Sequence, residues 1–253
     1  LQLPAECGPC SENTPLFSVY GETGTAYLRN MVGEEYDGTW SMVEALPTTY
    51  EGEILQPSVS GYSECSTYGF QVSPLQEMGG FIPSALYTRK LDIEWPLESY
   101  DDHQIYFSPR TFESPYSVYY NRYKYTEGTL NSATPILNQR YLSIPWQLLD
   151  NLRSLAESII QDYDTPFEKL KALEAYLKEN YEYDENYNLS PSDIDPVEWF
   201  LFHEQRGVCA NFNSAFVLLA RSVGLPARLV GGYLIDPVSE SQTVGAKQRH
   251  AYA

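Results

Sequence analysis

The chain has 253 residues, of which 43% are hydrophobic and 20% are charged, a balance typical of a globular protein large enough to bury a sizeable core. Sixteen Lys and Arg residues against 34 Asp and Glu residues give a formal net charge of −18 at pH 7. A surface of that sign repels phosphate backbones and anionic lipid, so the composition argues against a nucleic-acid partner. No run of 18 apolar residues indicates a membrane-spanning helix.

Residues 1–140 are predicted to form an antiparallel β-rich domain. Residues 16–21 and 26–32 have the composition of strands, and an Asp-Gly turn follows at residues 37–38 between aromatic neighbours. Tyrosines recur along residues 116–125, where they indicate half-buried strand positions, with a carbohydrate-binding surface as the alternative.

After residue 140 the pattern changes to helical spacing, so a second domain is predicted over residues 141–253. Apolar residues recur three and four apart between residues 148 and 160. The sequence TPFE at residues 165–168 has the pattern of a capping box with Pro at the first helical position. A short helix capped by Asp195 is expected further along.

A lone cysteine, Cys209, opens an amphipathic helix. Gly224 and Pro226 end this helix, and residues 229–235 have the composition of a buried strand. The apolar stripe of the helix consists of Phe212, Phe216, Leu219 and Val223.

The position of Cys209 in the first turn of a helix suits a nucleophile. The helix dipole and the free backbone N–H groups there favour a thiolate. His250 comes after the buried strand and a polar loop, and in that position it is a candidate base. A single cysteine among apolar residues is most often a packing residue. Gly207, which allows a close backbone approach, and His250 favour the catalytic interpretation here.

Three further cysteines, Cys7, Cys10 and Cys65, leave their pairing open. Cys7 and Cys10 have the spacing of a redox pair, but the residues after them have the composition of a loop rather than a helix. A structural disulfide or surface thiols are therefore favoured over redox chemistry. His103 and His203 do not supply the spacing of a zinc site.

Five linked pieces of the C-terminal half resemble the core of the transglutaminase-like superfamily, a papain-like thiol fold. In order they are Gly207-x-Cys209-x-x-Phe212, Leu219-Ala220-Arg221, Gly224-x-Pro226-Ala227-Arg228, Gly232-Tyr233 and His250-Ala251. Residues 27–40 and 195–201 resemble the extracytoplasmic part of bacterial and archaeal membrane-anchored transglutaminase-like proteins. The resemblance implies an α+β fold in which a papain-like core at 141–253 follows the β-rich domain.

The same resemblance implies a thiol acyltransferase with Cys209 as nucleophile and His250 as base. The thiolate attacks a glutamine-type carboxamide of a protein or peptide, and the acyl group passes to an amine or to water. The sequence does not choose between these acceptors, and the chemistry requires no metal and no organic cofactor. The implied location is the cell surface or periplasm, with the membrane reached only through segments outside this chain.

The chain departs from the usual family pattern at two positions, since Asn213 replaces an Ala and Tyr252 replaces a Trp. The family's triad also contains an Asp on the strand after the histidine, a position that falls beyond Ala253. The chain is therefore expected to be C-terminally incomplete and nearly inert by itself. Its first residue, Leu1, is likewise expected to mark a processed or truncated piece.

Two other functions stay open. The same residues could serve a cysteine peptidase or amidase, or the fold could persist as an inactive binding or assembly module. The intact Cys209 and His250 favour an enzyme, whereas a missing downstream Asp would favour the module. The oligomeric state and the role of the N-terminal domain are not indicated.

Overall fold

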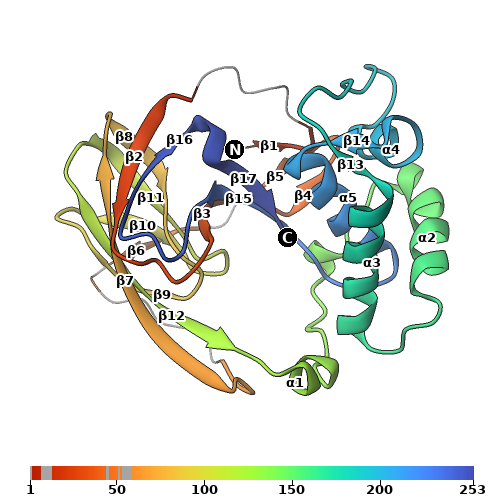
Figure 1. Ribbon diagram of the computed structural model, residues 1–253, viewed down its shortest axis with the longest axis horizontal. Coiled ribbons are helices and arrows are strands. Elements are labelled where there is room, and N and C mark those ends of the chain that lie inside the picture. The colour runs from red at the N-terminus through yellow and green to blue at the C-terminus, as the bar shows by residue number, and fades with distance from the viewer. Residues whose placement is uncertain (1, 7–12, 44–45, 51, 53–58) are drawn as a thin grey trace.

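The computed structural model describes residues 2–6, 13–43, 46–50, 52 and 59–253. Strands gather on one side of the molecule and helices on the other, with a small central sheet between them (Figure 1). The arrangement confirms the predicted α+β class, in which antiparallel sheets precede a helix-rich core.

The β-rich side contains two antiparallel sheets. One has the order β16-β2-β7-β12-β9 and the other β6-β10-β11-β8. The strands of the first are β2 (Pro15–Tyr20), β7 (Glu64–Pro74), β9 (Thr88–Asp92), β12 (Tyr116–Lys124) and β16 (Ser241–Gly245). Those of the second are β6 (Thr48–Tyr50), β8 (Met78–Ile82), β10 (Leu97–Tyr100) and β11 (Ile105–Phe112). Burial alternates along several of these strands, for example at Phe70 and Val72 of β7, as expected when one face of a sheet covers a core.

The helical side begins after the short helix α1 (Glu127–Asn131). Its helices are α2 (Trp146–Ile160), α3 (Pro166–Asn180), α4 (Pro196–Trp199) and α5 (Cys209–Ser222), with a π-helical turn at Phe200–Glu204. The predicted capping box is confirmed, because Thr165 and Glu168 exchange bonds between side chain and backbone. Asp195 caps α4 as predicted, and Gly224 follows α5 at a φ of +79°.

A three-stranded antiparallel sheet joins the two sides. It has the order β17-β15-β3, in which β15 (Leu229–Leu234) lies between β3 (Tyr27–Gly33) and β17 (Arg249–Tyr252). The register between β15 and β3 shifts at Gly231 and Gly232. A Cβ on Gly232 would lie 1.8 Å from the Leu28 carbonyl oxygen, so only glycine permits this approach.

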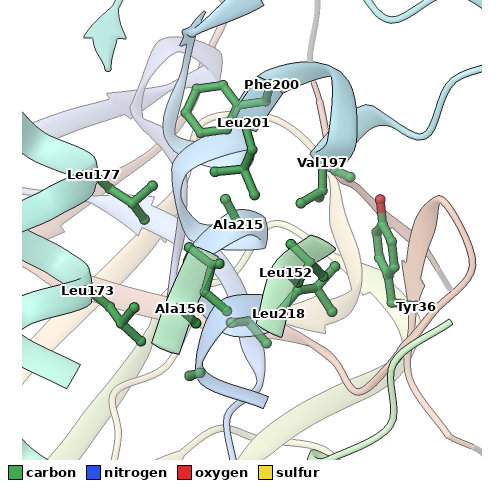
Figure 2. Close-up of a cluster of buried hydrophobic side chains, with 14 of the residues drawn as sticks. Tyr36, Leu152, Ala156, Leu173, Leu177, Val197, Phe200, Leu201, Ala215 and Leu218 are labelled. Atoms are coloured by element: carbon green, nitrogen blue, oxygen red, sulfur yellow. The ribbon is translucent and has the colours of Figure 1, made fainter. Parts of the chain in front are cut away.

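Residues near the N-terminus complete the core of the helical side. The hairpin of β4 (Glu35–Tyr36) and β5 (Thr39–Ser41), joined by β1 (Gln2–Pro4), packs against the helices. Tyr36 lies in the same buried cluster as Leu152, Val197 and Leu218 (Figure 2). The Trp40 indole donates to the Ser214 hydroxyl at 2.8 Å.

The predicted boundary at residue 140 stays a prediction. Strand pairing and side-chain packing join residues before this position to residues after it. Strand β16 belongs to the first β-rich sheet, and Ile235 and Val244 contribute to its core. Strand β3 pairs with β15 of the C-terminal part. Within the described residues, no helix is long and apolar enough to cross a membrane.

We predict that Gly232→Ala lowers the free energy of unfolding by about 3 kcal/mol or more, because the added methyl group meets rigid backbone of β3. Gly128→Ala is the matched control. Gly128 lies in α1, and the nearest atom to an added Cβ is Thr126 Oγ1, 3.9 Å away. The control is expected to leave stability unchanged or to raise it by up to about 1 kcal/mol. Urea unfolding measures both, and equal stabilities of the two variants would contradict the prediction.

Candidate active site

The backbone around Cys209 explains how its helix begins. Strand β14 (Arg206–Gly207) pairs in parallel with β13 (Glu182–Tyr183), and α5 starts two residues after Gly207. The Asn211 side-chain oxygen accepts the Val208 N–H at 3.0 Å. A Cβ on Gly207 would lie 2.7 Å from Asn211 Cγ, so glycine leaves the room that this bond needs.

The N-terminus of α5 has no side-chain cap, because Val208 carries no acceptor. The first N–H groups of the helix, which the half-buried Cys209 opens, therefore receive no oxygen from the N-cap residue. Such groups attract an anion, either a thiolate or an oxygen that gains negative charge during a reaction.

His250 is fixed on β17 opposite Gly232 of β15. Its ring stacks on Tyr27 of β3, with centroids 5.9 Å apart and planes 24° apart. Tyr27 in turn contacts Tyr252 at 4.7 Å. Burial lowers the pKa of His250 below its usual value of 6.5, which keeps the imidazole neutral and able to accept a proton near pH 7.

The structure brings the two predicted residues to one cavity. Cys209 and His250 both line a space of about 420 Å³. Its other walls come from β1, β3 and β15 and are mainly apolar, including Leu3, Met31 and Leu229. His250 also borders a second cavity of about 620 Å³.

The other titratable candidates from the sequence lie apart from this site. Within the described part of the chain, no carboxylate forms a hydrogen bond or ion pair with His250, and no group of His, Cys, Asp and Glu could hold a metal. Cys65 is a free, exposed thiol on β7. Cys7 and Cys10 lie outside the described residues, so their pairing is not addressed.

Tyr183 is a site residue that the sequence analysis missed. Strand pairing places it opposite Gly207, two residues before Cys209. Burial raises the pKa of Tyr183, and the proximity of Cys209 adds to this effect, while a bond from the Cys209 backbone acts in the opposite direction. The strand pairing and the causes of the pKa shift both indicate that Tyr183 lies near Cys209. The sequence signal was the alternation at residues 181–183 after α3, but nothing local indicated the pairing partner.

Asn213 is the second missed residue. Its side-chain amide donates to the carbonyl oxygens of Cys209 and Ala251, both at 2.9 Å. The available signal was its departure from the usual family residue, at a polar position in an otherwise apolar helix.

An ionic cluster holds the segments on either side of the site. Arg206 contacts Asp184 at 2.9 Å and Glu204 at 2.6 Å, and Glu204 accepts bonds from Asn188. These groups join the loop after β13 to the segment before α5. They thereby support the pairing that places Tyr183 beside Cys209.

Residues 153–253 match the family model of the transglutaminase-like superfamily. This part of the chain, which contains Cys209 and His250, belongs to that superfamily.

Two curated relatives match about half of the chain. Uncharacterized protein YebA of Bacillus subtilis strain 168 is 41% identical over 135 residues, which are 50% of this chain and 18% of that protein. A protein-glutamine gamma-glutamyltransferase of Pseudomonas aeruginosa PAO1 is 32% identical over 128 residues, which are 48% of this chain and 19% of that protein. The matched part of the chain therefore corresponds to less than a fifth of the length of either relative.

A solved structure shares the fold over nearly the whole chain. The periplasmic domain of TgpA from Pseudomonas aeruginosa, bound to ethylmercury, superposes with a TM-score of 0.68 at 20% identity. The superposition covers 95% of this chain and 84% of that one. The similarity therefore includes the β-rich side as well as the helical core.

The lowered pKa of His250 predicts a pH-dependent cost of folding. Below its usual pKa of about 6.5 the unfolded chain binds a proton that the folded chain resists, so the folded state loses stability as pH falls through that value. We expect this loss to be smaller in His250→Gln, which cannot titrate. Urea unfolding of both proteins between pH 7.5 and 5 measures the difference, and parallel stability curves would contradict it.

Proposed function

We propose that this chain carries the acyl-transfer site of a transglutaminase-like enzyme, with Cys209 as nucleophile and His250 as general base. The observation that supports this most is the cavity that both side chains line at the uncapped N-terminus of α5. The neutral state that burial favours for His250 suits a base.

The reaction proposed has two steps. The Cys209 sulfur attacks the carbonyl carbon of a glutamine-type carboxamide while His250 takes the thiol proton. The C–N bond then breaks, ammonia leaves with the proton from the imidazolium, and a thioester remains. A primary amine attacks the thioester to give a new amide, or water attacks to give a carboxylate, and either step frees the thiol.

In both steps the carbonyl oxygen of the substrate gains negative charge, and hydrogen-bond donors are needed to stabilise it. The Cys209 backbone N–H is one candidate, because it lies in the first turn of α5, where no N-cap side chain occupies the donors. We propose that the Tyr183 hydroxyl, which strand pairing brings near Cys209, is a second donor to the substrate oxygen.

The substrate class proposed is protein-bound glutamine, by analogy with the relative named a protein-glutamine gamma-glutamyltransferase. A peptidase or amidase acting through the same residues is the alternative within the enzyme class. We further propose that residues 1–140 form a β-rich domain beside a catalytic core at 141–253.

The location proposed is extracytoplasmic, in a membrane-anchored parent protein. The fold shared with a periplasmic domain supports this. Fractionation of cells that make the full-length protein tests it, and recovery in the cytosol alone would contradict it.

We predict that Cys209→Ala and His250→Ala each lower amine incorporation by the full-length protein at least about a thousandfold. The assay follows a fluorescent primary amine bound to a glutamine-containing protein, with ammonia release measured in parallel. Cys65→Ala is the matched control, since this exposed thiol lies on β7 and should be dispensable. Activity of Cys209→Ala within tenfold of the unchanged protein would refute the assignment, and ammonia release without amine incorporation would favour the amidase.

Tyr183→Phe is predicted to lower kcat by about a hundredfold while KM changes little, because a lost oxyanion donor acts on the transition state. The control is Tyr163→Phe, which removes a hydroxyl of a similarly exposed tyrosine on the connection between α2 and α3. If both variants retain the original kcat, Tyr183 has no part in stabilising the oxyanion.

A further inference from the structure

One side chain connects the two elements that carry the candidate catalytic residues. Asn213, one turn into α5, donates to the Cys209 carbonyl oxygen and to the Ala251 carbonyl oxygen, both at 2.9 Å. Cys209 begins the helix, and Ala251 directly follows His250 on β17. Both acceptors are carbonyl oxygens, so the amide nitrogen, which has two hydrogens, is the group that must face them.

The bond to Ala251 matters because β17 is short and has a partner on only one side. It has four residues and lies at the edge of its sheet, where β15 is its neighbour. Pairing with β15 fixes the strand along the sheet, but α5 is not part of that ladder. Among the described residues, Asn213 makes the only side-chain hydrogen bond between α5 and β17.

The bridge ends beside the aromatic contacts that surround His250. Asn213 donates to the residue immediately before Tyr252. Tyr252 contacts Tyr27, whose ring stacks on His250. The bridge thus fixes β17 from the side of the helix, while the aromatic rings hold the imidazole from the side of β3.

We propose that Asn213 is a positioning residue that sets the separation of the Cys209 sulfur and the His250 imidazole. The inference rests on the proposed acyl-transfer function. Asn213 touches neither substrate nor reacting atoms, and it acts through the backbone on each side of the pair. A small displacement of a base from its nucleophile slows proton transfer strongly, by up to about a hundredfold per ångström.

An ordinary helix contact is the competing explanation, and the chain supplies a control for it. Asn180 at the end of α3 donates to the Tyr176 carbonyl oxygen at 2.9 Å, across the same four-residue spacing as Asn213 and Cys209. Asn180 is exposed, and within the part of the chain that the structure describes its side chain makes no hydrogen bond to a strand. Asn180→Ala therefore removes the intrahelical bond without removing a bridge.

The test compares Asn213→Ala, Asn213→Asp and Asn180→Ala in the full-length protein. Asp keeps the shape of Asn, but its ionised carboxylate cannot donate, so it also serves if the Ala variant folds poorly. We expect both Asn213 variants to lower kcat about 10- to 100-fold, with KM for the carboxamide within about twofold. The pH at which iodoacetamide alkylates Cys209 at half its maximal rate should also rise, because a more distant imidazole accepts the thiol proton less readily. Asn180→Ala should match the unchanged protein in both measurements.

The outcomes separate this inference from the proposed function. If Cys209→Ala and His250→Ala abolish activity but the Asn213 variants keep the original kcat and alkylation profile, only the positioning role is refuted. A rise in KM with an unchanged alkylation profile would also overturn it, because loosened substrate binding is then the defect. If Cys209→Ala retains activity, the proposed function itself fails, whatever the Asn213 variants do.

Discussion

The close antiparallel contact of β15 with β3 is the constraint on which the rest of the site depends. The Gly232 backbone approaches the Leu28 carbonyl oxygen more closely than any side chain would allow. Because β17 pairs with the other edge of β15, the same contact also fixes where His250 lies relative to α5. A strand from the N-terminal part therefore determines the geometry of a residue near the C-terminus.

Buried charges reinforce the contact between the two sides. Arg29 of β3 is almost fully buried and donates to the His103 carbonyl oxygen at 2.7 Å, and burial lowers its pKa to about 10. The His103 ring nitrogen Nε2 lies 3.1 Å from a Glu34 carboxylate oxygen. Burial opposes ionisation of Glu34, but bonds from His103 and Val43 outweigh it and lower the pKa. Removing one member of the Glu34–His103 pair would leave the other buried without its partner, which is costly for a buried charge.

Local signals in the sequence were sufficient for the ends of the core helices and for proposing Cys209 and His250 as site residues. The capping box at Thr165, the Asp195 cap and the stop at Gly224 each depend on a few neighbouring residues, and all three are present in the structure. Cys209 and His250 were identified from motifs of a few residues. Pairing between strands that are far apart in the sequence left no such signal. The pairing of β16 with β2 and that of Tyr183 with Gly207 each depend on two separate segments. Loop closure and register decide these pairings, and both depend on the whole chain.

The uncapped start of α5 shows how stability and function are balanced here. A Ser, Thr or Asp at the position of Val208 would satisfy a first-turn N–H and add about 1 kcal/mol of stability. It would also occupy the donors that a charged oxygen or a thiolate needs. Val208 carries no acceptor and leaves those donors open, with Tyr183 of the neighbouring strand pair close by. The local rule is thus broken at the residue before Cys209, as expected if this helix end serves the proposed reaction rather than folding.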